Sequence, residues 1–441
     1  MTDHEEAVSR LQQMLRFDTT NLPGNELALV AHLAAELKVE GLEAEVLQAA
    51  PERASLAVRL RGDGSQRPLL LMSHLDVVPA EPDRWSHPPF AGEIADGILY
   101  GRGAIDSKLT AAVHLQVLLM AHRQGLPLKR DLVVIAAADE EVGGTYGMAW
   151  LAQEHPEWLD AEYGINEAGG FAVVVDGRPI YTCQVAEKGG AEVDLVARGR
   201  PGHSSVPHDD NPIVHLGQAL TALGGKLPHR VTPAVRAFFE SAAETMRPEV
   251  KSLLLDLLNP DLCAQALAEL PTGPPVKGMF DAMLRNTCAP TMLSAGIKRN
   301  VIPSEALASL SGRPLPGVSE ADFIGEVTDL LGDATRHVDV QMGSFRPGVA
   351  FDHETPLLGA LSIALQRHEP GAVLAPYMQT GGTDARYLKD LDISVYGFVP
   401  MRYEKGCDFF DLCHGHDERV SLENVAFAVD VTYDAMRLLN E

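Results

Sequence analysis

Hydrophobic positions in the first part of the chain follow two different periods. Residues 26–38 carry apolar side chains at helical spacing, and residues 109–124 do the same over a longer stretch. Residues 69–73 and 131–138 are short apolar runs of strand length, and residues 92–106 resemble a hairpin with a glycine turn. Strands that alternate with helices predict an α/β fold, in which a mostly parallel sheet has helices on both faces.

The pattern changes after residue 186. Three segments now alternate apolar and polar residues, as strands with one solvent-exposed face do: 191–198, 297–310 and 338–342. Helical spacing occurs between them at 211–224 and over the long stretch 234–258. We therefore expect residues 187–346 to form a smaller α+β domain.

The order of helix and strand seen at the start returns near the C-terminus. Residues 355–367 and 422–439 have helical spacing, and residues 393–399 form a strand-like run. The chain is thus predicted to build one domain from residues 1–186 and 347–441, with the smaller domain inserted between these two parts.

Composition narrows the range of functions. The chain has 441 residues, of which 46% are hydrophobic, so it can bury sizeable cores. Its formal net charge of −25 repels phosphate backbones and anionic lipids, so we expect neither nucleic acid nor membrane as a partner. No run reaches the about 18 to 20 apolar residues of a membrane helix, and the start MTDHEEAVSR lacks the apolar core of a signal peptide.

The cysteines indicate a reducing compartment. There are five, mostly far apart, namely Cys183, Cys263, Cys288, Cys407 and Cys413. A small, odd number does not suit a disulfide framework. Cys407 and Cys413 lack the CxxC spacing of zinc sites, so they are interpreted as packing residues. A cytoplasmic location is predicted.

Polar residues follow both apolar strands of the first part. His74 and Asp76 close the first strand, and Asp139–Glu141 close the second. The carboxyl ends of parallel strands meet at one edge of a sheet, where functional groups collect. Three consecutive carboxylates beside a buried strand are costly unless a cation neutralises them. One divalent metal ion would do so, and two would suit a site that also holds Asp106.

Each of these residues also has a purely structural interpretation. His74 taken alone is typical of a hydrogen-bonded buried histidine, and Asp106 or Ser107 is typical of an N-cap for the helix over 109–124. Asp139–Glu141 taken alone are equally compatible with a solvated strand end. The functional interpretation therefore depends on the combination, since all of these residues sit at the ends of elements along one sheet.

Seven motifs in order resemble the M20 metallopeptidases, a family that includes aminoacylase-1, carboxypeptidase S, acetylornithine deacetylase and succinyl-diaminopimelate desuccinylase. They are HLDVVP, GRGAIDSK, DEEVGG, GRPGHSS, KRNVIPSEA, GGTDA and HGHDERV. The resemblance extends from about residue 5 to residue 440, and residues 83–108 are most similar to the aminoacylase-1 and carboxypeptidase S side. It implies a mostly parallel-sheet zinc-hydrolase domain with an inserted lid and dimerisation domain.

The resemblance also implies a site for two Zn²⁺ ions, with Co²⁺ or Mn²⁺ as possible substitutes. Asp106 would bridge both ions. His74 and Glu167 would complete one site, and Glu141 and His414 the other. Imidazole and carboxylate groups without thiolate are ligands that suit zinc.

Two of these ligand assignments have competitors. His414 is favoured over His416, because the family's ligand histidine stands about four residues before a glutamate. Glu167 is favoured over Glu162 and Asp160, because the family's ligand follows its strand.

Catalytic roles follow from the same resemblance. Glu140 matches the general base, which takes a proton from the water molecule that bridges the two metal ions. Asp76 matches a carboxylate that orients the imidazole of His74. His203 matches a histidine that stabilises the oxyanion, and in dimeric members the partner subunit supplies it. A homodimer is therefore expected.

Substrate-contacting positions are also implied. Asn300 and Arg313 match such positions, and a guanidinium can bind a free α-carboxylate with two hydrogen bonds. Gly381 and Gly382 could offer backbone N–H groups to the same carboxylate. The family has aspartate two residues before the arginine, where this chain has Ser311.

The sequence thus predicts a zinc-dependent amide hydrolase for a small peptide or N-acyl-amino acid that carries a free carboxylate. The alternative is a non-catalytic, metal-dependent peptide-binding protein on the same scaffold. Hydrolysis of such a substrate would support the enzyme, and tight binding without hydrolysis would support the binding protein.

Overall fold

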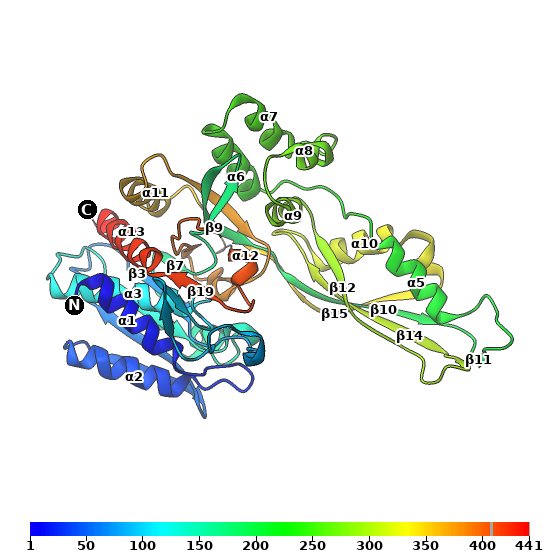
Figure 1. Ribbon diagram of the computed structural model, residues 1–441, viewed down its shortest axis with the longest axis horizontal. Helices are drawn as coiled ribbons and strands as arrows, with labels where there is room; N and C mark the ends of the chain where they lie inside the picture. Colours follow the sequence, from blue (N-terminus) through cyan, green and yellow to red (C-terminus); the bar gives the residue numbers. More distant parts are fainter. Residues whose placement is uncertain (406–408, 441) are drawn as a thin grey trace.

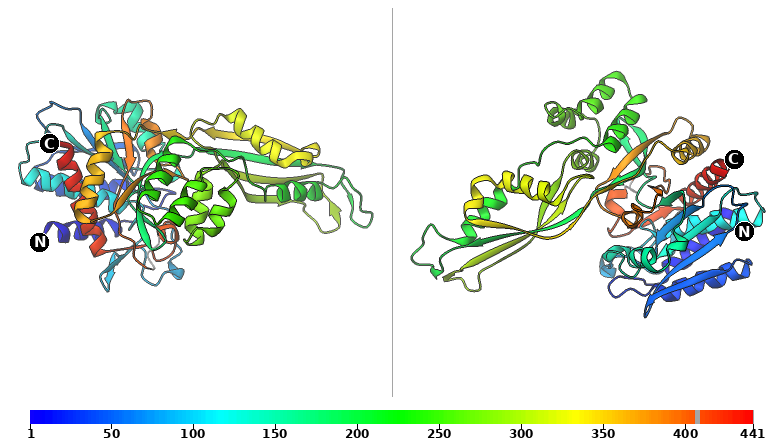
Figure 2. Two further views of the ribbon diagram at one scale, coloured as in Figure 1. Left: turned by 90° about the horizontal axis from the view of Figure 1, so that it is seen from above. Right: turned by 180° about the vertical axis from the view of Figure 1, so that it is seen from behind.

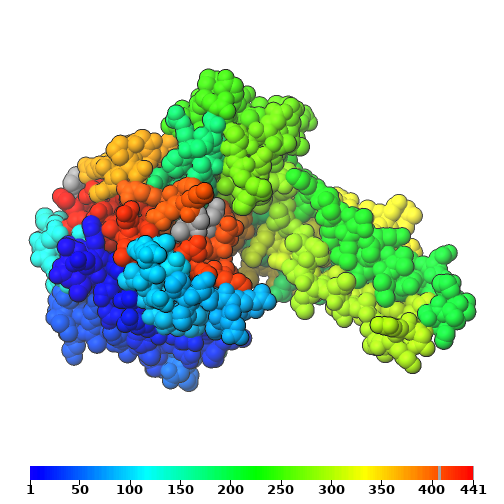
Figure 3. All heavy atoms as spheres, in the orientation of Figure 1, coloured from blue at the N-terminus to red at the C-terminus, as the bar shows by residue number. Residues whose placement is uncertain are grey.

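The fold consists of a compact part and a narrow part that projects from it. The computed structural model describes residues 1–405 and 409–440. Both termini lie in the compact part (Figure 1), and the views from above and behind show the same projection (Figure 2). In the space-filling view the narrow part stands clear of the rest over most of its length (Figure 3).

A ten-stranded sheet forms the centre of the compact part. Its middle strands, β6, β3, β7 and β18, pair in parallel, and antiparallel pairs dominate its two sides. The strands in spatial order are β1 (Ala44–Ala50), β2 (Arg53–Leu60), β6 (Leu132–Ala137), β3 (Leu69–His74), β7 (Tyr163–Asn166), β18 (Ser394–Gly397), β9 (Arg178–Glu187) and β16 (Val349–Ala350), with β8 (Ala172–Val175) and β17 (Val373–Gln379) also paired to β9. The predicted α/β class is confirmed.

Both faces of this sheet are buried, which explains the continuous apolar runs in its strands. Along β3, Leu69 and Leu71 enter one hydrophobic cluster, and Leu70 and Met72 enter another on the opposite face. The first cluster is covered by α1 (Asp3–Leu15), α2 (Glu26–Val39), α3 (Lys108–Arg123), α11 (Pro356–His368) and α13 (Leu422–Asn440), and the second by α4 (Met148–Glu154). Helices on both faces were predicted, and both are present.

A four-stranded antiparallel sheet forms the narrow part. Its order is β12 (Thr287–Ala295), β14 (Glu305–Arg313), β10 (Gly190–Arg198) and β15 (Val338–Arg346), with α5 (Pro212–Ala222) and α10 (Glu320–Leu331) packed against it. The prediction of one strand over 297–310 is wrong, because the chain turns between 296 and 300 and β14 begins at Glu305. The short strands β11 (Gly202–His203) and β13 (Val301–Ile302) pair at the far end.

The long helix predicted over 234–258 is wrong: two short helices stand in its place, and two more follow them along the chain. They are α6 (Pro233–Glu244), α7 (Pro248–Asp256), α8 (Cys263–Glu269) and α9 (Pro274–Met283). Arg247 is extended, with ψ of 153°, because the residue before a proline disfavours helical geometry. Helix α6 packs on β17 of the central sheet, where the rings of Phe238 and Tyr377 lie 6.1 Å apart. The division of the chain into two domains stays a prediction.

The remaining elements are short. A three-stranded sheet joins β4 (Glu93–Ala95), β5 (Ile98–Tyr100) and β19 (Arg419–Ser421), so the predicted hairpin is present. The others are α12 (Phe409–Leu412) and the 3₁₀ helices η1 (Pro82–Arg84), η2 (Glu140–Val142), η3 (Pro156–Trp158), η4 (Gly332–Arg336) and η5 (Asp384–Leu388). No helix within residues 1–405 and 409–440 has the length and apolar character to cross a membrane. Cys407 lies outside the described residues.

Candidate metal centre

The sequence-predicted ligands come from the edge of the central sheet where its parallel strands end. His74 is the last residue of β3, Glu141 lies in η2 just after β6, and Glu167 directly follows β7. Asp106 precedes α3, and His414 follows α12 from the other end of the chain. The structure brings all five side chains together.

Asp106 lies at the centre of this group. Its Oδ1 is 3.1 Å from His74 Nε2, which in turn is 3.2 Å from Glu167 Oε2. Its Oδ2 is 3.0 Å from His414 Nε2, which is 3.3 Å from Glu141 Oε2. The two oxygens of one carboxylate therefore face two separate histidine–glutamate pairs.

The competing histidine points elsewhere. His416 Nε2 lies 2.9 Å from Glu81 Oε2 in an exposed ion pair. Its neighbour His414 is the one that meets Asp106, so the geometry favours the predicted choice.

The competing carboxylates also lie outside the group. Glu162 forms an ion pair with Arg130 at 3.0 Å, and Asp160 is a mostly exposed partner of Arg67. Glu167, by contrast, is buried beside His74.

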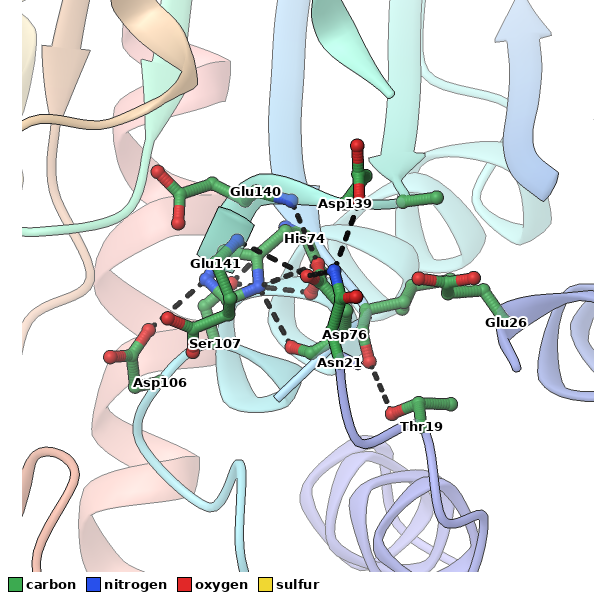
Figure 4. A network of polar contacts seen from close by, with 12 residues as sticks. Thr19, Asn21, Glu26, His74, Asp76, Asp106, Ser107, Asp139, Glu140 and Glu141 are labelled. Carbon is green, nitrogen blue, oxygen red and sulfur yellow. Dashed lines mark hydrogen bonds and ion pairs between the residues drawn. The ribbon is translucent and has the colours of Figure 1, made fainter. Parts of the chain in front are cut away.

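Asp76 holds both strand ends in place. It is fully buried, and its carboxylate accepts hydrogen bonds from Asn21 Nδ2 at 2.8 Å and from the backbone N–H groups of Glu140 at 3.0 Å and Glu141 at 3.1 Å (Figure 4). Nδ1 of His74 lies 3.0 Å from the Asp76 carbonyl oxygen and 3.5 Å from its carboxylate. Burial alone would raise the pKa of Asp76, but the hydrogen bonds from His74, Asn21 and Glu141 lower it. Asp76 thus fixes the His74 ring and the η2 turn together.

Asp139 corrects the expectation that one cation neutralises three consecutive carboxylates. It has φ of 70° and turns away from the other two. Its carboxylate pairs with Arg53 at 2.7 Å and accepts a hydrogen bond from Asn21 at 3.0 Å. Arg53 also binds both carboxylate oxygens of Glu26. A buried guanidinium therefore neutralises Asp139.

The remaining carboxylates crowd together. Burial and neighbouring carboxylates raise the pKa of Glu140 and of Glu167, and they raise the pKa of Glu141 to about 6. Hydrogen bonds to Asp106 and Glu141 raise the pKa of His414 to about 10. Both effects reflect an excess of buried negative charge.

The donor set fits divalent cations. Candidate ligand atoms of His74, Asp106 and Glu141 lie within 4.8 Å of one another, as do those of His74, Glu140 and Glu167. Oε1 of Glu141 is buried and has no hydrogen-bond partner among the described residues. Imidazole and carboxylate are ligands that suit zinc, cobalt and manganese.

Cys413 also lies in this centre, although its sequence indicated only packing. Its Sγ is 3.0 Å from Oδ2 of Asp106, and burial raises the pKa of its thiol. Its position directly before His414 was the signal that could have found it. Ser107 is the N-cap residue of α3, as one structural interpretation predicted, but its side chain does not cap the helix, because its hydroxyl bonds to the backbone of His74.

A cavity of about 450 Å³ opens beside the candidate ligands. The predicted substrate-contacting residues Arg313, Gly381 and Gly382 line it. Arg346 and Arg386 line it too, and the sequence did not single them out. Arg386 Nη1 lies 3.8 Å from Oε1 of Glu140, so the predicted base lies within reach of a cation.

His203 and Asn300 lie elsewhere in this chain. His203 is in β11, at the far end of the narrow part, and its Nδ1 contacts the hydroxyl of Ser205 at 2.8 Å (Figure 1). The carbonyl oxygen of Asn300 accepts a hydrogen bond from the N–H of Ser204 at 3.2 Å. Within one chain neither residue lines the cavity, so a catalytic role for either requires a second chain.

Comparisons with known proteins agree with this geometry. Residues 70–438 match the family model described as peptidase family M20/M25/M40. The probable carboxypeptidase S-like 2 of Dictyostelium discoideum is 30% identical over 87% of this chain and 74% of that protein. The N-fatty-acyl-amino acid synthase/hydrolase PM20D1 of Xenopus tropicalis is 29% identical over 83% of this chain and 71% of its own. A solved M20 family metallo-carboxypeptidase from Sulfolobus solfataricus superimposes with a TM-score of 0.72 at 18% identity, covering 99% of each chain.

Proposed function

We propose, from the premise that this chain belongs to peptidase family M20/M25/M40, that it is a zinc-dependent hydrolase of peptides or N-acyl-amino acids with a free carboxylate. Family membership makes it a metallohydrolase of amide bonds, in line with relatives named as carboxypeptidase S-like and as an N-fatty-acyl-amino acid hydrolase. The observation that carries the proposal is Asp106, whose two oxygens face His74 with Glu167 and His414 with Glu141.

These five side chains are the proposed ligands of two Zn²⁺ ions, for which Co²⁺ or Mn²⁺ could substitute. When bound, such a pair of cations supplies Lewis acidity to the scissile carbonyl and to the attacking water. Asp76 holds the His74 ring and the η2 turn in the geometry that binding requires.

Glu140 is the proposed general base. It lines the cavity next to Glu141, and its carboxylate is close enough to the His74 and Glu167 donors to meet a water held there. It takes a proton from the attacking water and gives it to the leaving amine nitrogen. At the other side of the cavity, Arg313 and the N–H groups of Gly381 and Gly382 are proposed to bind the free carboxylate.

We further propose a homodimer that places His203 and Asn300 in the partner's cavity. Strand β12 is the edge of the four-stranded sheet, and its Met292 and Leu293 are 71% and 66% exposed. An exposed apolar edge strand is a surface on which a second copy can extend the sheet. In this arrangement His203 would contact the oxyanion and Asn300 the substrate, which neither residue can do within its own chain.

The substitution Glu140→Gln tests the mechanism. It should lower kcat by about 10²- to 10⁴-fold, since a general base contributes that much, while two equivalents of zinc stay bound by metal analysis. Glu162→Gln is the matched control, because Glu162 lies outside the cavity and pairs with Arg130. Undiminished turnover in Glu140→Gln would remove the proposed base. Tight binding of a dipeptide and N-acyl-amino-acid panel without hydrolysis would instead support the non-catalytic alternative.

A further inference from the structure

We propose that Arg346 and Arg386 join Arg313 in one anion site that selects substrates with two carboxylates, namely those whose free-carboxylate residue is aspartate or glutamate. The proposal rests on the proposed hydrolase function and specifies its substrate. It starts from how two adjacent strands present their last residues.

Arg313 and Arg346 lie on either side of a glycine at the base of the four-stranded sheet. They end β14 and β15, the two neighbours of β10. Gly190 pairs with Arg346, and Ala191 pairs with Gly312, so the next position along β14 sets Arg313 opposite Gly190. Directly opposite residues in antiparallel strands point to the same face. The two guanidinium groups are thus presented side by side.

The glycines leave room for Arg346 to reach the catalytic turn. A Cβ atom on Gly190 would lie 3.5 Å from its Nη2, and a Cβ atom on Gly143 would lie 3.6 Å from its Nη1. Gly143 directly follows η2, which carries Glu140. A side chain from the four-stranded sheet therefore contacts the turn that carries the proposed base.

Arg386 approaches the same cavity from the central sheet. It lies in η5, stacks over the Tyr387 ring at 4.9 Å, and has Nη1 3.8 Å from Glu140 Oε1. Arg313, Arg346 and Arg386 all line the cavity of about 450 Å³. The three guanidinium groups thus come from the four-stranded sheet and from η5, and they face one space.

Two of these three guanidinium groups lack counter-charges. Within residues 1–405 and 409–440, no carboxylate lies within ion-pair distance of Arg313 or Arg346, and Arg386 has only Glu140 within that distance. Burial and the positive charges of Arg346 and Arg386 lower the pKa of Arg313. Three crowded guanidinium groups are unexpected in a chain with a net charge of −25, unless a ligand supplies the negative charge.

A count of charges gives the class of ligand. Two divalent ions would be balanced by the carboxylates of Asp106, Glu140, Glu141 and Glu167. The charge of Arg386 is already met, because it interacts with the buried carboxylates of Asp384 and Glu187, whereas Arg313 and Arg346 have no carboxylate within ion-pair distance among the described residues. About two positive charges remain for the substrate. A free α-carboxylate meets one of them, and an acidic side chain on the same residue meets the other.

The test compares N-acetylglutamate with N-acetylglutamine, which has nearly the same shape but no side-chain charge. The wild-type zinc enzyme should show at least a 10-fold higher kcat/KM for the acid. Arg346→Gln should lower kcat/KM for the acid by about 10- to 100-fold, chiefly through KM, and change the value for the amide by less than about 2-fold, since a charge-assisted hydrogen bond is lost only for the acid. Arg346→Lys should recover part of the loss.

Arg336→Gln is the control, because Arg336 is an exposed arginine of the same part of the chain that pairs with Asp333 outside the cavity. Equal turnover of both substrates by the wild type, or equal loss of both in Arg346→Gln, overturns the arginine site and leaves the hydrolase function intact. If neither amide is cleaved, the hydrolase function is in question, and calorimetric titration with glutarate decides this proposal. Binding that Arg346→Gln weakens supports the site, and absence of binding by the wild type overturns it.

Discussion

Arg53 is the residue whose removal should most clearly test the reasoning about buried charge. Its side chain is 7% exposed, and it donates to Glu26 at 2.8 and 2.9 Å, to Asp139 at 2.7 Å and to the Pro23 carbonyl oxygen at 3.1 Å. Glu26 and Asp139 are at most 2% exposed. Arg53→Met would remove the guanidinium and leave two buried carboxylates without their cation.

The expected loss in the free energy of unfolding is about 3 to 5 kcal/mol, because breaking a buried pair leaves uncompensated charge in a medium of low dielectric constant. Arg61→Met serves as the surface control. Arg61 pairs with Asp131 at 2.8 Å but is 77% exposed, so its loss should cost less than about 1 kcal/mol. Urea unfolding of both variants, followed by tryptophan fluorescence, measures the difference.

A second substitution separates charge from packing. Adding Glu26→Gln to Arg53→Met removes one of the two stranded charges, so the double variant should be more stable than the single one. The deficit should also depend on pH. Burial already raises the pKa of Glu26 despite Arg53, so the folded state binds this proton more tightly than the unfolded state. The deficit of Arg53→Met should therefore grow as pH rises above about 5 and shrink as pH falls.

The reasoning would be refuted by a loss below about 1 kcal/mol in Arg53→Met. A double variant no more stable than the single one would also refute it, because the effect would then arise from lost packing of the arginine side chain.

Other outcomes follow from the same geometry. His414→Ala should weaken zinc binding by more than about 100-fold in a competition titration, whereas His416→Ala should not, and equal losses would contradict the assignment. His114 has no hydrogen-bond partner among the described residues, and burial lowers its pKa to about 3, so the unfolded state gains its proton first as pH falls below 6.5. His114→Leu should therefore remove about 2 kcal/mol of the stability lost by pH 5, and an unchanged pH profile of urea unfolding would argue against this. Mixing His203→Ala chains with Glu140→Gln chains should restore part of the activity that each lacks alone, and no recovery would argue against a site shared between chains.

Elements buried on both faces were the most predictable from the sequence. The apolar runs of β3 and β6 are too short for typical helices, so their length indicated buried strands, and the polar residues at their ends indicated the site. Strand β12 was missed because most of its residues are exposed, so burial imposes no clear alternation on it. The single helix over 234–258 failed at Pro248, where the local backbone preference outweighs the apolar period.

Site residues were predictable where a motif carried them and not where tertiary register did. His74, Asp106 and Glu141 stand in recognisable motifs. The ion pair between Arg53 and Asp139 joins positions 86 residues apart, and no pattern in either segment predicts it. Arg346 reaches the cavity only because the register of β15 sets it opposite Gly190. Long-range pairing of this kind is a property of the folded chain.

The packing of α6 on β17 has a practical consequence for the construction of chimeras between relatives. A chimera in which all of residues 187–346 came from a relative would lose the contact between Phe238 and Tyr377, and it would expose the apolar surface of β17 that α6 covers. A chimera that keeps residues 233–283 of this chain and exchanges only the flanking segments, 190–232 and 284–346, preserves this packing.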